Sequence, residues 1–143
     1  MEHDKDDALK LENQLCFPLY AAARKIVGAY TPYLKPLGLT YTQYILFLVL
    51  WERDGLLVSE ICERLMLDSG TVTPLLKKLE AKGYLRRERS ESDERCVRVV
   101  LTDEGRAMKE RAGDIPAKMC SCMALSPEQA KQLYELLYMI LKG

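Results

Sequence analysis

Five cysteines are the side chains of this 143-residue chain best suited to chemistry, namely Cys16, Cys62, Cys96, Cys120 and Cys122. An odd number of thiols without zinc-finger spacing argues against both a disulfide framework and a metal site. The one histidine, His3, lies in a polar terminus, which argues against Ser–His–Asp triads and most catalytic zinc sites. We therefore expect neither an enzyme nor a metal or cofactor site, and each thiol either packs or reacts.

Cys16 stands out because it lies next to an apolar stripe that includes Leu15 and Leu19, on the same strip as Tyr20. We expect its side chain to be partly buried near several phenols. Pro18 either kinks the surrounding helix or marks its first turn. In the second case, unpaired backbone N–H groups, the helix dipole and phenol hydrogen bonds would favour the thiolate, which is the reactive form. The alternative is a helix cysteine that only packs.

Periodicity and capping signals predict the elements that position these groups. Apolar residues in steps of three and four predict a long helix at about 9–34. Thr40 and Gln43 have the spacing of a capping box, which opens a buried helix with its body at 44–51 that ends at Gly55. The later pattern predicts a short helix at 58–66 and then a helix that is capped by Asp68 or Ser69 and closed by Gly83. Two strands follow, at 85–89 and 96–101. The chain then continues in a helix from Thr102 to about 122, which Pro116 kinks, and in a helix that Ser126 caps.

Helix, short helix, helix and hairpin in this order are typical of a winged helix-turn-helix. Its second helix would lie in the major groove, with short hydroxyl side chains at base edges and lysines near phosphates. The hairpin loop would extend Arg95, held by Asp93, into a narrow minor groove. The candidate DNA-binding residues are Ser69, Gly70, Thr71, Thr73, Lys77, Lys78, Arg86, Asp93 and Arg95.

Charge is distributed unevenly along the chain. Its 21 basic and 21 acidic residues cancel, which excludes binding to nucleic acid through net charge alone. Residues 69–98 nevertheless carry eight Lys and Arg against five Asp and Glu. This local excess favours DNA contact, and a solvated surface of mixed charge is the alternative.

The segment Asp93-Glu94-Arg95 and the residues 99–105 after it resemble the wing of the MarR family of dimeric winged-helix regulators. Residues 11–17, 39–44 and 67–77 are similar to the OhrR-like branch of that family, which senses organic hydroperoxides. The resemblance implies that Cys16 is the peroxidatic cysteine, that Tyr30 and Tyr41 bond its sulfur, and that Tyr20 lies nearby. It also implies a repressor that leaves double-stranded operator DNA when an organic hydroperoxide oxidises Cys16.

The expected fold class is mainly α with a small β-hairpin wing. We expect a single domain, 1–143, in which dimerisation helices at about 9–38 and 102–143 flank a winged helix-turn-helix at about 40–101. The outer helices should pair in a homodimer, because nothing else in one subunit covers their apolar stripes. No apolar stretch reaches the length of a membrane span and the acidic start is no signal peptide, so we expect a cytoplasmic protein without a membrane partner.

Three questions stay open at the level of sequence. Either Cys120 or Cys122 of the partner subunit resolves the oxidised Cys16, or a small cellular thiol does, whereas Cys62 and Cys96 are interpreted as packing residues. A small aromatic ligand between the dimerisation helices and the winged domain is an alternative trigger. A thiol peroxidase is a further alternative, although no histidine or arginine stands beside Cys16 and Arg24 is only on the same helix.

Overall fold

The computed structural model describes residues 5–89 and 96–143, which form two compact units. The terminal unit comprises the chain up to Ile26 and from Pro116 onward, and the winged-helix unit comprises Val27–Ile115. Among the described residues, none of the helices combines the length and the apolar character of a membrane span. The assignment of 9–38 and 102–143 to dimerisation within a single domain stays a prediction.

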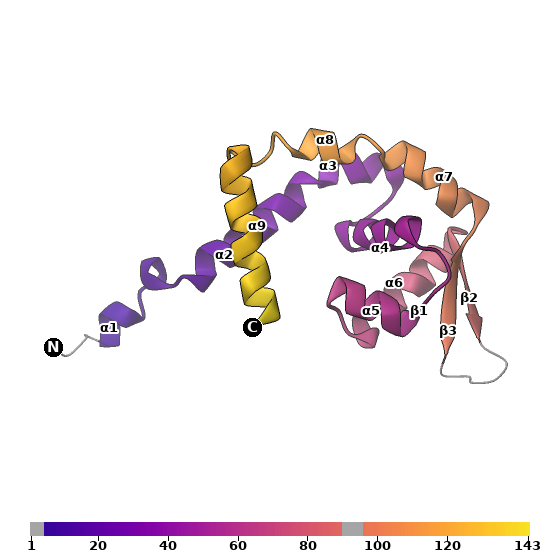
Figure 1. Cartoon of the computed structure of the whole chain (residues 1–143), viewed down its shortest axis with the longest axis horizontal. Coiled ribbons are helices and arrows are strands. Elements are labelled where there is room, and N and C mark those ends of the chain that lie inside the picture. Colours follow the sequence, from indigo (N-terminus) through magenta and orange to yellow (C-terminus); the bar gives the residue numbers. More distant parts are fainter. Residues whose placement is uncertain (1–4, 90–95) are drawn as a thin grey trace. The chain divides into compact units, whose positions relative to one another are not determined.

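The winged-helix unit is a cluster of helices beside a small sheet (Figure 1). Its elements are α3 (Thr31–Leu34), the 3-10 helix η2 (Lys35–Leu37), α4 (Tyr41–Glu52), β1 (Leu56–Leu57), α5 (Val58–Leu65), α6 (Ser69–Ala81), β2 (Leu85–Arg89), β3 (Val97–Leu101) and α7 (Asp103–Ala112). The predicted fold class, mainly α with a small hairpin wing, is confirmed.

Side-chain caps start the helices where the sequence predicts. The Thr40 hydroxyl accepts from the Gln43 N–H at 3.3 Å, and the Gln43 side chain accepts from the Thr40 N–H at 3.1 Å. Asp68 rather than Ser69 caps α6, because its Oδ1 accepts from the Thr71 N–H at 2.8 Å. These bonds satisfy N–H groups that a helix start otherwise leaves unpaired, so they fix where α4 and α6 begin.

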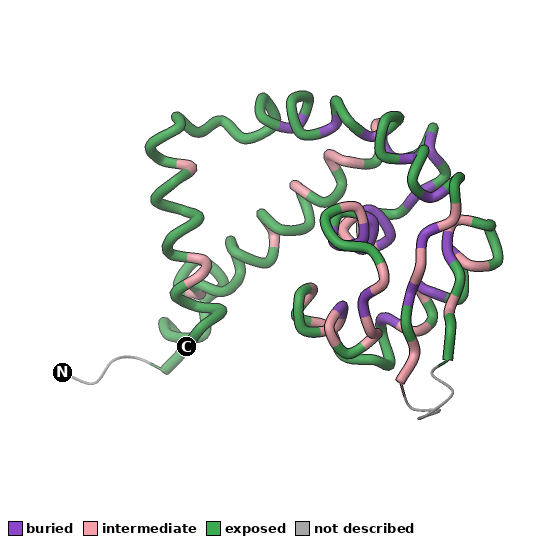
Figure 2. Tube along the Cα trace, turned by 45° about the vertical axis from the view of Figure 1, so that its right-hand side comes forward, coloured by how far each residue is buried: buried purple, intermediate pink, exposed green. Residues whose placement is uncertain are grey.

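The core of the winged-helix unit lies where α4, α5, α6 and the sheet meet (Figure 2). Phe47, Ile61, Val72, Leu76, Leu79 and Val99 are fully buried there. Leu48 is 42% exposed, so the prediction that residues 44–51 are buried all round is wrong at that position. The helix also ends at Glu52, three residues before Gly55, which instead forms a turn with a φ of 74°.

The sheet has three antiparallel strands in the order β1–β3–β2. Leu85 pairs with Leu101 at one end of the hairpin, and Arg89 pairs with Val97 at the other. The predicted hairpin is confirmed, with β3 beginning at Val97 rather than at residue 96. β1 was not predicted, because two residues are too short to show an alternating pattern.

Two predicted helices are interrupted. The helix expected at 9–34 is divided into the 3-10 helix η1 (Leu11–Asn13), α2 (Cys16–Ala29) and α3, and the short helix α1 (Lys5–Ala8) precedes it. Pro18 lies in the first turn of α2, where its missing N–H costs least, and Pro32 likewise lies at the start of α3. The helix expected at 102–122 ends at Ala112 and is followed by α8 (Ile115–Met119), so Pro116 opens a helix instead of kinking one.

The terminal unit contains most of the exposed apolar side chains of the chain. Neither α2 nor α9 (Pro127–Lys142) contains a buried residue among those described. The predicted cap of α9 is confirmed, since the Ser126 hydroxyl accepts from the Gln129 N–H at 3.2 Å. Ahead of α2, the Gln14 amide donates to the carbonyls of Ala8 and Lys10 at 2.7 and 2.9 Å, which holds the segment before Cys16.

Candidate functional site

The helix α6 presents one polar face to solvent and packs with the other. Val72, Leu76 and Leu79 are buried, as predicted, and Leu75 is half-buried. Ser69, Gly70, Thr71, Lys77 and Lys78 are exposed. Thr73 is half-buried, so the prediction that it faces outward is only partly right. The exposed residues place hydroxyls at the start of the helix and lysines two turns later.

Thr71 is more constrained than its exposure indicates. Hydrogen bonds from its hydroxyl and its N–H lower the pKa of the Asp68 carboxyl. Thr71 is therefore held beside Asp68 at the start of α6, with its N–H used by the helix cap.

Gly70 has no packing role inside the chain. A methyl group built on it would lie 3.4 Å from the Asp68 carboxylate, which is an ordinary contact. At Gly105 in α7, by contrast, the same methyl group would lie 2.1 Å from the Tyr84 carbonyl oxygen. Gly105 is required by close packing, whereas Gly70 leaves free space on the outer face of α6.

Several of the cations counted in the sequence are used inside the unit. Arg87 is paired with Glu80 at 3.0 Å, Arg98 donates to the Gly55 carbonyl, and Lys82 donates to the Gly38 carbonyl at 2.7 Å. The exposed Arg86 lies 4.0 Å from Glu88, which is a weak ion pair. Lys77 and Lys78 make no ion pair with any residue that the structure describes. Asp93 and Arg95 lie outside the described residues, so their wing-tip role stays a prediction.

Glu80 connects α6 to the wing. Its Oε2 accepts from the Arg87 N–H at 2.7 Å, and its Oε1 accepts from the Arg87 side chain at 3.1 and 3.0 Å. These hydrogen bonds lower the pKa of the Glu80 carboxyl, and the bond from the Arg87 backbone N–H has the largest effect. The pair fixes the angle between the helix and β2, which sequence reasoning missed because charge counting does not show partners.

Three tyrosines gather at the start of α4. The ring centroid of Tyr30 lies 4.9 Å from that of Tyr41 and 5.6 Å from that of Tyr44. Burial raises the pKa of both Tyr41 and Tyr44, and Tyr30 adds to the effect at Tyr44. The phenols of Tyr41 and Tyr44 thus stay protonated near neutral pH and can donate. The sequence identified Tyr30 and Tyr41, and the spacing of Tyr44, three residues after Tyr41, was the signal for the third.

Cys16 is the first residue of α2 and is exposed. The expectation of partial burial is wrong within one chain, because Cys16 is exposed, the neighbouring Leu15 is 86% exposed, and no residue that the structure describes covers them. Tyr20 is also exposed, and the Arg24 guanidinium lies 5.5 Å from its ring centroid. Cys16 and Tyr20 belong to the terminal unit, whereas Tyr30 and Tyr41 belong to the winged-helix unit. Their contact with the sulfur stays a prediction.

The other thiols have different surroundings. Burial and the nearby Asp68 carboxylate raise the pKa of Cys62, which keeps it a neutral thiol suited to packing. Cys96 is half-buried. Cys120 and Cys122 follow α8, are exposed, and are accessible to a second thiol; the resolving role stays a prediction. Among the described residues, no cluster of His, Cys, Asp and Glu has the composition of a metal site.

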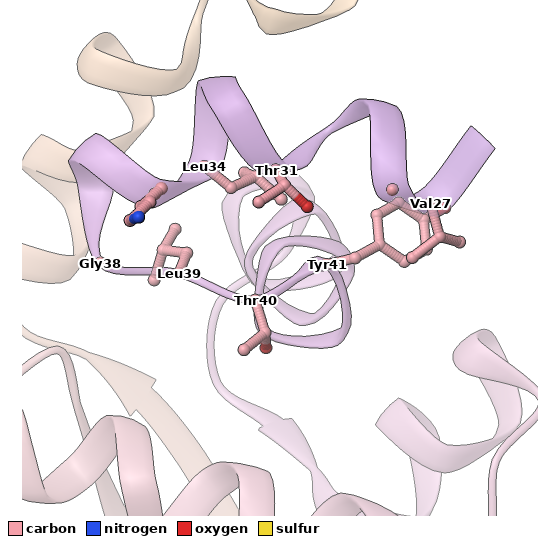
Figure 3. A pocket seen from close by; sticks show the side chains of 9 residues that line it. Val27, Thr31, Leu34, Gly38, Leu39, Thr40 and Tyr41 are labelled. Carbon is pink, nitrogen blue, oxygen red and sulfur yellow. The ribbon is translucent and has the colours of Figure 1, made fainter. Parts of the chain in front are cut away.

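A pocket of about 370 Å³ opens beside Tyr41 (Figure 3). The side chains of Val27, Thr31 and Leu39 line it together with the Tyr41 ring. Its walls are mainly apolar, and Thr31, Thr40 and the charged Lys35 add polar groups to its lining. A pocket of this size and composition accommodates a small aromatic molecule.

Comparisons with known proteins agree with this architecture. Residues 29–112 match the family described as transcriptional regulator SarA/Rot. The chain is 48% identical over 139 residues to the organic hydroperoxide resistance transcriptional regulator of Bacillus subtilis (strain 168), covering 97% of this chain and 95% of that one. It is 41% identical over 125 residues to the regulator SarZ of Staphylococcus epidermidis, covering 87% of this chain and 84% of that one.

Solved structures of AbfR, a protein of Staphylococcus epidermidis, are also similar. Reduced AbfR bound to DNA is 37% identical with a TM-score of 0.79, and 96% of each chain is covered. Overoxidised AbfR bound to DNA has a TM-score of 0.79, and disulfide-formed AbfR has one of 0.68. Because the family match spans more than half of the chain and these relatives match along most of their length, the chain belongs to the SarA/Rot family of transcriptional regulators, which has a MarR-like winged-helix fold.

Proposed function

We propose that this protein is a redox-sensing, homodimeric repressor that holds operator DNA while Cys16 is reduced and releases it when an organic hydroperoxide oxidises Cys16. The observation that carries the proposal is the exposed Cys16 thiol at the first turn of α2, in a chain 48% identical to a regulator of organic hydroperoxide resistance. AbfR, which is seen on DNA in its reduced and overoxidised states and also in a disulfide-formed state, supports redox chemistry at a thiol of a DNA-binding regulator. Because the operator is chromosomal, we place the regulator in the cytoplasm.

DNA binding is assigned to α6 and the wing. The exposed hydroxyls of Ser69 and Thr71 reach base edges, and Lys77 and Lys78 neutralise phosphates. The Glu80–Arg87 pair keeps the wing at a fixed angle to α6, so both contact the duplex together. Arg86 and, at the wing tip, Arg95 add contacts to the phosphates and the minor groove.

The chemical step needs no cofactor. The Cys16 thiolate attacks the terminal oxygen of the hydroperoxide, the O–O bond breaks, and the alkoxide leaves as an alcohol after taking up a proton. The resulting sulfenic acid then condenses with a second thiol, either Cys120 or Cys122 of the partner or a small cellular thiol, and water leaves. The Tyr30 and Tyr41 phenols hydrogen-bond the sulfur before the reaction, with Tyr20 nearby, and the new S–O or S–S bond breaks those contacts.

Dimerisation is assigned to the helices of the terminal unit. Large apolar side chains along α2 and α9 are exposed in one chain, including Leu19, Tyr134, Leu136 and Met139. Apolar faces of this extent mark an interface between subunits. A twofold dimer would present two α6 helices to two half-sites of a palindromic operator.

The test is a gel shift on duplexes selected by the reduced protein from a random-sequence library. We expect cumene hydroperoxide to lower the affinity of the wild type by about a hundredfold, because a coupling of about 2.7 kcal/mol is enough. Cys16→Ser should keep the affinity and lose the response, whereas the matched control Cys62→Ser should keep both. Peptide mapping by mass spectrometry identifies the oxidised residue. Unchanged binding by protein whose Cys16 is shown to be oxidised would reject the proposal.

The pocket beside Tyr41 favours a second candidate function, control by a small aromatic ligand. In that case a phenolic compound should release DNA from Cys16→Ser as well as from the wild type. Replacing Thr31 by Leu at the pocket wall should weaken that response and leave the response to peroxide intact. Sustained consumption of peroxide with a thiol reductant would instead support a thiol peroxidase.

A further inference from the structure

Met66, in the turn between α5 and α6, has an unusual backbone conformation. Its φ is 55° and its ψ is 39°, and it is the one non-glycine residue of the described chain with a positive φ. Its N–H donates to the carbonyl of Glu63 at 3.3 Å, which closes the C-terminus of α5. Glycine adopts this left-handed conformation without strain, whereas in methionine the Cβ atom crowds the backbone and raises the energy of this conformation.

Packing does not account for the methionine. Its side chain is 58% exposed, more than any other large apolar side chain described in the winged-helix unit. Val27 and Leu48, at 40% and 42%, are the others in this class. A strained residue whose apolar side chain faces solvent indicates a function outside the fold.

Its position indicates what that function is. Met66 precedes by two residues the Asp68 cap of α6, and two residues span at most about 7 Å. The exposed residues Ser69 and Thr71 follow at once, so Met66 lies at the end of α6 that enters the groove. The left-handed backbone ends α5 here and leaves the side chain free on the outside of the turn.

We propose that Met66 is a DNA-contacting residue that packs its thioether side chain against apolar atoms of the operator, either a thymine methyl group or a deoxyribose ring. The inference rests on the proposed function, since it requires DNA at the N-terminus of α6. An unbranched, polarisable side chain adapts to an irregular surface of this kind. Burying about half of a methionine side chain corresponds to roughly a fivefold gain in affinity.

The test compares three variants of the full-length reduced protein on the library-selected duplex. Met66→Gly removes both the side chain and the backbone strain. Met66→Asn replaces the apolar side chain by a polar one that tolerates a positive φ, and Met66→Leu keeps an apolar side chain. We expect the first two to bind roughly fivefold more weakly, with a melting temperature unchanged or raised, and the third to bind within twofold of the wild type. Replacing single thymines by deoxyuridine in the duplex then distinguishes the sources. If the substitution lowers the affinity of the wild type but not that of Met66→Gly, Met66 contacts a thymine methyl group. If it does not lower the affinity of the wild type, Met66 contacts a sugar.

The outcomes separate this inference from the proposed function. If the wild type selects no duplex, the proposed function fails. If the wild type binds and Met66→Gly binds equally well, the contact at Met66 is overturned. It is equally overturned if Met66→Leu loses as much affinity as Met66→Gly. Should Met66→Gly prove unstable, Met66→Asn provides the same comparison with a side chain that restricts the unfolded chain more.

Discussion

The winged-helix unit and the terminal unit bury their apolar side chains very differently. In the first, Phe47, Ile61 and Leu76 lose all contact with solvent, and capping residues fix the helix starts. In the second, α2 and α9 have apolar residues along their length and none is buried. Because exposed apolar area costs free energy, the winged-helix unit is stabilised by its own core, whereas the exposed apolar residues of the terminal unit are the basis for the proposed dimer.

This difference also separates the two proposed roles. The unit assigned to DNA binding has its own buried core and hydrogen-bonded helix starts, which suits a surface that contacts a fixed duplex. In the proposed homodimer, the unit with Cys16 would make contacts with a second chain, so a chemical change at one sulfur would alter those contacts without unfolding the DNA-binding unit. The proposed roles, DNA binding in one unit and redox sensing in the other, therefore match the way in which each unit is stabilised.

The largest expected effect is in the core of the winged-helix unit. Phe47→Ala removes a fully buried ring that stacks on Trp51 with centroids 5.0 Å apart. We expect a loss of about 3–5 kcal/mol in the free energy of unfolding, measured by urea titration with circular dichroism. The matched control, Leu15→Ala, removes an exposed side chain and should change this value by less than about 0.5 kcal/mol at a protein concentration below dimerisation. Equal losses in both variants would contradict the comparison.

The second effect concerns the apolar surface of α9. Met139→Lys places a charge on a side chain that is 69% exposed in one chain. If that surface is the subunit interface, the charge is desolvated, and we expect the dimer dissociation constant to rise about a hundredfold in sedimentation experiments. Lys131→Ala, on the same helix, should change it by less than threefold. Trp51 fluorescence should show that the winged-helix unit stays folded.

The third effect is the connection between helix and wing. Glu80→Gln weakens charge-assisted hydrogen bonds to the Arg87 N–H and guanidinium, with an expected loss of about 1–1.5 kcal/mol. Since the pKa of Glu80 is lowered below its ordinary value of 4.5, the charged carboxylate stabilises the fold fully above that pH. The stabilisation is lost as the pH falls through the lower, folded pKa. Urea titrations should therefore show wild type and variant converging in acid, and a difference independent of pH would contradict this account.

The features that sequence predicted are those set by near neighbours. The caps at Thr40, Asp68 and Ser126 each involve a residue three positions on, so the pattern is visible in a short window. The buried stripe of α6 is equally local, because its members recur within two turns. Family resemblance pointed to Tyr30 and Tyr41 as partners of the Cys16 sulfur but not to their contact with each other, which arises because the chain reverses between α3 and α4.

The features that sequence missed depend on distant partners. β1 exists because Leu56 pairs with Val99, and two residues alone show no strand pattern. Lys82 and Arg98 added to the positive count, yet they bond carbonyls 44 and 43 residues away in sequence. Periodicity placed Cys16 beside an apolar stripe, but a stripe does not show whether its own chain or another chain covers it.

The smallest expected change in stability is at Gly70, where we expect the free energy of unfolding and the affinity for DNA to change in opposite directions. Gly70→Ala introduces a methyl group that makes only an ordinary contact, 3.4 Å from the Asp68 carboxylate, and alanine favours a helix over glycine by about 0.5–1 kcal/mol. We expect the free energy of unfolding to rise by up to that amount while affinity for the selected duplex falls about tenfold, because the methyl group occupies the surface that DNA approaches. Gly105→Ala is the matched control, since its methyl group meets the Tyr84 carbonyl and should destabilise the fold by more than about 2 kcal/mol. A Gly70→Ala protein that gains stability and binds DNA as well as the wild type would show that the start of α6 is not in close contact with the duplex.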